Sequence, residues 1–186
     1  MKSASSLVSA LLLISIFMAG PYSSAADRDT LVDVTGVAVI VEEISEDAEK
    51  DGLSAGYLKK LVEEKLTDAG VMVLEERKWF SVFGGAYLLV KFIGSKSSSE
   101  QYYIVFVDIE LHQTVVLFGK KLGENITTAA STWSTGKLFS CRAPGLKECV
   151  GATVGQLTDI FIDDYKTVNT KQQDQSSGKK RRKNAK

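Results

Sequence analysis

Residues 101–119 read QYYIVFVDIELHQTVVLFG, and alternate side chains in this stretch fall into two sets. Side chains on a β-strand point to opposite faces in turn, so a period of two separates the faces of a sheet. One face is apolar throughout and carries Tyr103, Val105, Val107, Ile109 and Leu111. The other face carries Tyr102, Ile104, Phe106, Asp108, Glu110 and His112. The stretch predicts a long strand with its first face on a core and its second face exposed.

Four other stretches also favour strands, because they are short, rich in β-branched or aromatic residues and bounded by turn residues. They are residues 30–44, 71–76, 87–93 and 126–137. Two stretches instead repeat apolar residues at spacings of three and four, which is typical of amphipathic helices. The helix predicted after Ser54 carries Leu58, Leu61, Val62 and Leu66, and the last one carries Val150, Val154, Leu157, Phe161 and Tyr165.

The helix predicted after Ser54 has a clear signal at each end. Ser54 can accept a hydrogen bond from an unpaired backbone N–H at the start of the helix. Gly70 can adopt the left-handed conformation that commonly ends a helix. Together these elements predict an α+β fold in the order β-α-β-β-β-β-α, with a single, mostly antiparallel sheet of about five strands. Both helices are expected on one face of the sheet, against the Tyr103–Leu111 side.

The N-terminus resembles a secretory signal peptide. Lys2 supplies an early positive charge, residues 7–18 are mainly apolar, and small residues follow at 23–26. The apolar run is shorter than the roughly 20 residues that a membrane-spanning helix needs. We therefore predict a signal peptide over 1–25, with an uncleaved N-terminal anchor as the alternative. The predicted product is periplasmic or secreted, with a single domain over 30–167.

The charges are unevenly distributed. Of the 23 basic residues, one lies in the predicted signal peptide and six lie at the C-terminus, which leaves 16 basic residues against 23 acidic ones. The six are Lys179, Lys180, Arg181, Arg182, Lys183 and Lys186. We predict that residues 168–186 form a disordered basic tail. Such a tail is either a solvated end or an electrostatic contact with an anionic membrane surface. Nucleic acid is an unlikely partner, because no aromatic residue interleaves with the basic ones.

Cys141 and Cys149 are the only cysteines, and they flank a short segment with Pro144 and Gly145. Two cysteines that close a short turn usually pair in an oxidising compartment. We predict a Cys141–Cys149 disulfide. A structural zinc site would lack ligands, because the chain has two cysteines and one histidine.

Two groups of residues are candidate sites. Asp108, Glu110 and His112 share one face of the predicted long strand, where they could bind a metal ion or exchange protons. The same spacing is also typical of a strand end that faces water. The aromatic residues Trp79, Phe80 and Phe83 could contact a partner or simply cover the sheet edge.

No nucleophile elbow, phosphate-binding loop or nucleotide-binding glycine motif is present, and we expect no cofactor. Asn125-Ile126-Thr127 fits the glycosylation sequon, which has a consequence only in a eukaryotic secretory pathway.

Residues 34–120 resemble small periplasmic α/β domains. The matching features are Ala69-Gly70 before a strand and Val107-Asp108 in a later strand. The stretch is similar to the N-terminal domain of the Tol-Pal β-propeller protein and to domains of curli-secretion and penicillin-binding-protein-activator lipoproteins. The chain departs from them in having no lipobox cysteine and no propeller, and in having an added disulfide loop. The resemblance implies a non-enzymatic envelope module that binds proteins.

The leading hypothesis is accordingly a non-catalytic interaction module that binds an unknown envelope or secreted protein. One alternative is a small metal-dependent or acid/base enzyme that uses Asp108, Glu110 and His112. The other alternative is an electrostatic binder of anionic surfaces that acts through the basic tail.

Overall fold

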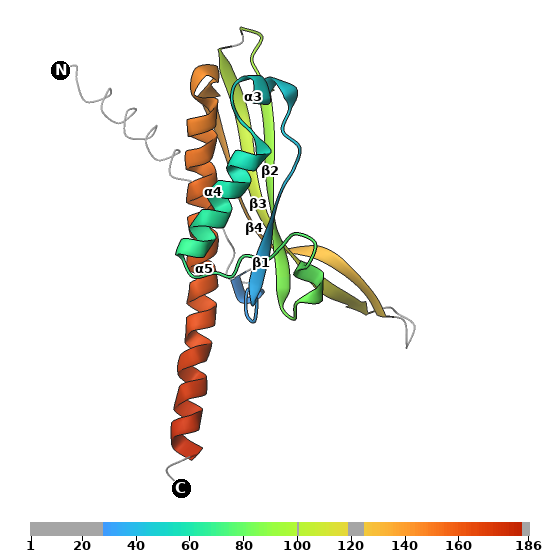
Figure 1. Cartoon of the computed structure of the whole chain (residues 1–186), viewed down its shortest axis with the longest axis vertical. Helices are drawn as coiled ribbons and strands as arrows, with labels where there is room; N and C mark the ends of the chain where they lie inside the picture. Colours follow the sequence, from blue (N-terminus) through green and yellow to red (C-terminus); the bar gives the residue numbers. More distant parts are fainter. Residues whose placement is uncertain (1–27, 100, 119–124, 184–186) are drawn as a thin grey trace, which may run out of the picture.

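The computed structural model describes residues 28–99, 101–118 and 125–183, and its centre is a mixed sheet (Figure 1). The strands lie in the order β1 (Gly36–Val41), β2 (Gly85–Lys96), β3 (Tyr102–Phe118) and β4 (Asn125–Arg142). β1 pairs with β2 in parallel, and the other two pairings are antiparallel. The predicted long strand is therefore β3, at an interior position of the sheet.

Three α-helices are described: α3 (Glu46–Lys50), α4 (Ala55–Asp68) and α5 (Leu146–Lys183). Two short 3-10 helices, η1 (Trp79–Ser81) and η2 (Ala143–Gly145), precede β2 and α5. The predicted start and end of α4 are confirmed. The Ser54 hydroxyl accepts a hydrogen bond from the Tyr57 N–H, and Gly70 has a φ of 79° directly after the C-cap.

One face of the sheet is covered. α4 contacts β1 and α5, and α5 contacts β3 and β4. The β3 side chains that point to this side are almost fully buried, as predicted, and they join the apolar stripes of α4 and α5 in one core. This confirms the predicted α+β class and the predicted covered face. The physical cause is the strict alternation along β3, which presents one continuous apolar surface to the helices.

The sheet has four strands, so the prediction of about five is corrected. Residues 71–76 form only an isolated parallel bridge between Val37 and Val73. The Val37 N–H donates to the Met72 carbonyl, and the Leu74 N–H donates to the Val37 carbonyl. Glu75 and Glu76 follow at once, and the chain turns away before a ladder can extend. The longer parallel neighbour of β1 is β2.

The last helix runs beyond the predicted C-terminal boundary of the domain. We predicted that the domain ends at residue 167 and that 168–186 are disordered, but α5 continues to Lys183. Val168 is buried, and the Asn169 side-chain amide donates to the Leu31 carbonyl at 3.1 Å. Lys, Arg and Gln are good helix formers, so a helix nucleated by its packed half can propagate through such a sequence.

In Figure 1 the C-terminal half of α5, in red, runs past the end of the sheet. Five of the six basic residues of the predicted tail, Lys179 to Lys183, are the last residues of this helix. The sixth, Lys186, lies outside the described residues. The predicted signal peptide, residues 1–25, also lies outside them. Within the described residues, no helix is long and apolar enough to span a membrane.

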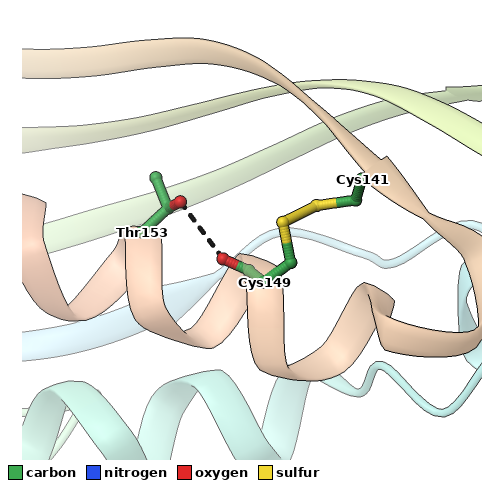
Figure 2. Close-up of a disulfide and its surroundings, with 3 residues drawn as sticks. All are labelled: Cys141, Cys149 and Thr153. Atoms are coloured by element: carbon green, nitrogen blue, oxygen red, sulfur yellow. Dashed lines mark hydrogen bonds between the residues drawn. A yellow bond between two sulfur atoms is a disulfide. The ribbon is translucent and has the colours of Figure 1, made fainter.

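The predicted disulfide is confirmed. Cys141 lies at the end of β4 and Cys149 in the first turns of α5, with their Cα atoms 6.3 Å apart (Figure 2). The Thr153 hydroxyl donates to the Cys149 carbonyl at 3.1 Å, one turn further along the helix. The bridge therefore ties the last strand of the sheet to the helix that covers it.

Candidate functional site

The face of the sheet opposite α4 and α5, here called the open face, carries a patch of exposed apolar side chains. Ile93 of β2 is directly opposite Phe106 of β3, which is directly opposite Leu138 of β4. Ile104 lies two residues before Phe106 on the same face. The four residues are exposed by 61, 37, 69 and 64 %, in the order Ile93, Phe106, Leu138 and Ile104. We call these four residues the apolar patch.

Next to the apolar patch, the open face becomes polar. The Lys91 ammonium lies 2.5 Å from Oε1 of Glu110, and Nε2 of His112 lies 2.8 Å from Oε2 of Glu110. Both oxygens of Glu110 are therefore engaged. Asp108 is directly opposite Lys91 in the ladder and interacts with Glu110 through a side-chain hydrogen bond. The three residues predicted from the sequence are thus brought together, with Lys91 as a fourth member.

The pKa values of the two carboxyl groups are shifted in opposite directions. Burial, together with the hydrogen bond and the negative charge of Glu110, raises the pKa of Asp108 to about 6. Burial also raises the pKa of Glu110, but hydrogen bonds from Lys91, His112 and Asp108 outweigh it and lower that pKa overall. The Lys91 ammonium lies on Glu110, so of the two carboxyl groups Asp108 is the one that keeps its proton to higher pH.

Across residues 28–99, 101–118 and 125–183, no three His, Cys, Asp or Glu side chains are placed to hold a metal ion together. The reason is local, because Glu110 already binds Lys91 and His112 on its two oxygens. What the cluster can do chemically is exchange a proton through Asp108 near neutral pH.

An aromatic row continues the open face beyond His112. The Tyr87 and His112 rings stack with centroids 4.7 Å apart, and Trp79 lies 4.9 Å from Tyr87. A Cβ atom on Gly85 would lie 2.1 Å from the Trp79 carbonyl oxygen, so only glycine lets η1 fold back this closely onto β2.

The predicted aromatic loop is therefore divided. Trp79 is half-buried against Tyr87, whereas Phe80 and Phe83 are 67 and 91 % exposed. The alternative that these residues cover the sheet edge accounts for Trp79. It does not account for Phe80 and Phe83, whose rings remain in solvent.

Sequence reasoning missed Lys91, Tyr87 and the apolar patch. Lys91 had a visible signal, because it is the one charge within the apolar strand YLLVKFI. Leu138 had none, since it becomes the neighbour of Phe106 only through the register between β3 and β4.

Comparison with known proteins gives little. No protein-family model matches the chain, and no curated protein matches it. Among solved structures, the chain is similar to the PelC dodecamer from Paraburkholderia phytofirmans, with 12% identity and a TM-score of 0.44. That match covers 74% of this chain and 95% of PelC. A variant PelC dodecamer from the same organism matches with 12% identity and a TM-score of 0.43, over 74% of this chain and 93% of that one.

Proposed function

We propose that the chain is a non-catalytic protein-binding module of the cell envelope or the secreted fraction, and that it binds its partner through the open face. The observation that carries this proposal is the apolar patch. Its residues sit on three adjacent strands and form one contiguous surface, whereas a scatter of single exposed apolar residues would need no explanation.

The composition around the patch fits an interface. Stable protein interfaces combine an apolar centre with a polar rim, and aromatic residues are enriched in them. Here Phe106 and its aliphatic neighbours adjoin the Lys91–Glu110 pair, and Tyr102 lies at the far end of the same face. A sheet face is also a rigid platform, so little ordering entropy is lost when a partner binds.

The compartment in this proposal rests on two supports. The sequence of residues 1–25 predicts export, and the Cys141–Cys149 disulfide is a feature of oxidising compartments. Both favour a partner in the envelope or outside the cell.

Photo-crosslinking in the producing cell tests the proposal. A photoreactive phenylalanine analogue is placed at Ile104 or Leu138, and as controls at Lys60 or Glu64, which are exposed on α4. We expect a discrete adduct of the same mass from both open-face positions and none from the α4 positions. Equal labelling from both sides, or none from Ile104 and Leu138, would contradict the proposal.

An acid/base enzyme is the second candidate, and the raised pKa of the half-buried Asp108 favours it. The replacements Asp108→Asn and Ile104→Asp separate the two functions. A binding module loses its crosslinked partner with Ile104→Asp and keeps it with Asp108→Asn. An enzyme would show the reverse dependence in a screen for hydrolysis of model esters and glycosides.

A further inference from the structure

A recess lies where several elements meet at one end of the sheet. It has a volume of about 570 Å³ and is bounded by the end of α3, the end of β2, the start of β3, the end of β4 and η2. We call it the end pocket. Its size falls within the range of about 300–1,000 Å³ that is common for small-ligand sites. Its walls include Asp51, Lys96, Gln101, Tyr102, Arg142 and Pro144.

The walls of the end pocket are held in place by several independent contacts. Tyr102 and Arg142 form the last pair of the β3–β4 ladder, and the Ala143 N–H donates to the Gln101 carbonyl at 2.9 Å. The residue before Arg142 is Cys141, which the disulfide ties to α5. A site with fixed walls loses little entropy when it binds a ligand.

The described walls of the pocket carry three charged side chains, Asp51, Lys96 and Arg142. Asp51 accepts hydrogen bonds from the Tyr103 hydroxyl at 2.6 Å and from the Lys96 ammonium at 2.9 Å. The hydrogen bond from Tyr103 has the larger effect, and together the two hydrogen bonds lower the pKa of Asp51, so its carboxylate stays ionised. Asp51 is thus paired with Lys96, and Arg142 is the second cation among the described wall residues.

The Arg142 guanidinium lies against an aromatic ring. Its guanidinium carbon lies 5.8 Å from the centroid of the Tyr102 ring, and among the described residues no carboxylate is paired with it. A guanidinium presents five N–H donors in a planar fork that matches the two oxygens of a carboxylate. The Tyr102 ring and Pro144 beside it supply flat apolar surface.

We propose that the end pocket binds a small organic acid, with its carboxylate on Arg142 and its apolar body against Tyr102 and Pro144. The pocket adjoins the far end of the open face at Tyr102, but neither proposal depends on the other. The acid can be a free molecule or the carboxyl end of a peptide, since both present the same chemistry.

Binding of benzoate to the full mature chain tests the proposal, with benzamide as a neutral analogue of the same shape. The measurement is an NMR titration that follows the backbone amides of Gln101, Tyr102 and Arg142. We expect saturable shifts with benzoate, and no saturable shifts at these amides with benzamide. Shifts of equal size with both compounds would overturn the role of the carboxylate.

Two replacements test the assignment to Arg142. Arg142→Gln is expected to weaken benzoate binding about ten-fold or more, because charge-assisted hydrogen bonds are lost. The affinity of Arg142→Lys for benzoate should fall between those of Arg142→Gln and the wild type, since lysine keeps the charge but loses the planar fork of donors. Lys60→Gln removes the same charge from the exposed surface of α4 and should leave binding unchanged.

The result that would overturn the site is an equal affinity in Arg142→Gln and wild type. Arg142 is exposed, so both variants are expected to fold, and an unchanged melting temperature checks this. Free acid and peptide are then distinguished by titrating a tripeptide that ends in phenylalanine beside its C-terminal amide. Tighter binding of the acid form than of benzoate assigns the pocket to peptide ends, and weaker binding assigns it to free acids.

Discussion

Two isoleucines on the same strand show how differently the two faces of this sheet are used. Ile109 and Ile104 both lie in β3, five residues apart, and the odd spacing sends their side chains to opposite faces. Ile109 is fully buried under the helices, whereas Ile104 is 64 % exposed. Both positions are extended strand. What differs is whether another layer of the molecule covers the side chain.

The polar groups of the two faces follow the same division. On the covered side, the buried Asp164 accepts from Nε1 of Trp133 at 3.0 Å and pairs with Arg28 at 2.6 Å. Of the buried side-chain polar atoms in the described part of the chain, Oγ1 of Thr135 alone lacks a partner. On the open side, the Lys91–Glu110–His112 group remains partly in solvent. Polar groups on the covered face are thus buried and paired, whereas those on the open face keep part of their contact with water.

The largest expected effect is the loss of a core side chain. Ile109→Ala should lower the free energy of unfolding by about 2–5 kcal/mol, because it removes buried methyl groups and leaves a cavity. Ile104→Ala should change it by only about 0.5 kcal/mol or less, as is usual for an exposed position. Urea unfolding of both variants and the wild type gives the two values. Similar losses at both positions would show that the open face is covered in solution.

Removal of the disulfide is expected to have the next largest effect. Cys141 and Cys149 are eight residues apart, and closure of such a loop contributes about 2–3 kcal/mol in the chain-entropy model. The double variant Cys141→Ala, Cys149→Ala should lose this amount in urea unfolding.

Wild-type protein in reductant serves as the control for the disulfide and should lose a similar amount. Crosslinking from Ile104 should be unchanged in the double variant, because the bridge ties β4 to α5 on the covered side. A loss of crosslinking without a loss of stability would show that the disulfide acts on the open face, which contradicts the difference in use between the two faces.

The smallest expected effect concerns pH. The pKa of Asp108 is raised from 3.8 to about 6, so between these values the folded chain binds more protons than the unfolded one. The free energy of unfolding should therefore fall as pH rises through this window. Asp108→Asn cannot ionise, so its melting temperature should exceed that of the wild type near neutral pH, and the difference should shrink as pH falls.

Glu110 acts in the opposite direction. Its pKa lies below the ordinary value of 4.5, so its contribution to stability is lost only as pH falls through that lower range. Melting curves of wild type and Asp108→Asn between about pH 5 and pH 8 therefore isolate Asp108. A difference between the two proteins that stays constant over this range would show that the Asp108 carboxyl is not shifted in the folded state.

Much of the fold was predictable because its signals are local. The alternation in 101–119 predicted both the strand and which face meets the helices, and the burial of Val105, Val107 and Ile109 confirms it. The cap at Ser54 depends on one hydroxyl and the next turn of backbone, so it too could be read directly.

The errors arose where local signals were ambiguous. Residues 71–76 have the composition of a strand, but pairing depends on a neighbour that is distant in sequence, and only the Val37–Val73 bridge forms. Residues beyond 167 are polar, which is compatible with disorder or with an exposed helix. Asn169 joins the domain through its bond to the Leu31 carbonyl, a contact between residues far apart in the chain.

The candidate sites show the same limit. The sequence placed Asp108, Glu110 and His112 on one face, because a period of two is a property of a single strand. It did not bring Lys91 to Glu110, Leu138 to Phe106 or Arg142 to Tyr102, because each pair depends on the register between two strands. Register is decided by the packing of a whole face on the core and by hydrogen bonds along the ladder. Most of the secondary structure, the disulfide and the buried face were thus determined by short stretches of sequence. The apolar patch and the end pocket exist only once the strands have paired.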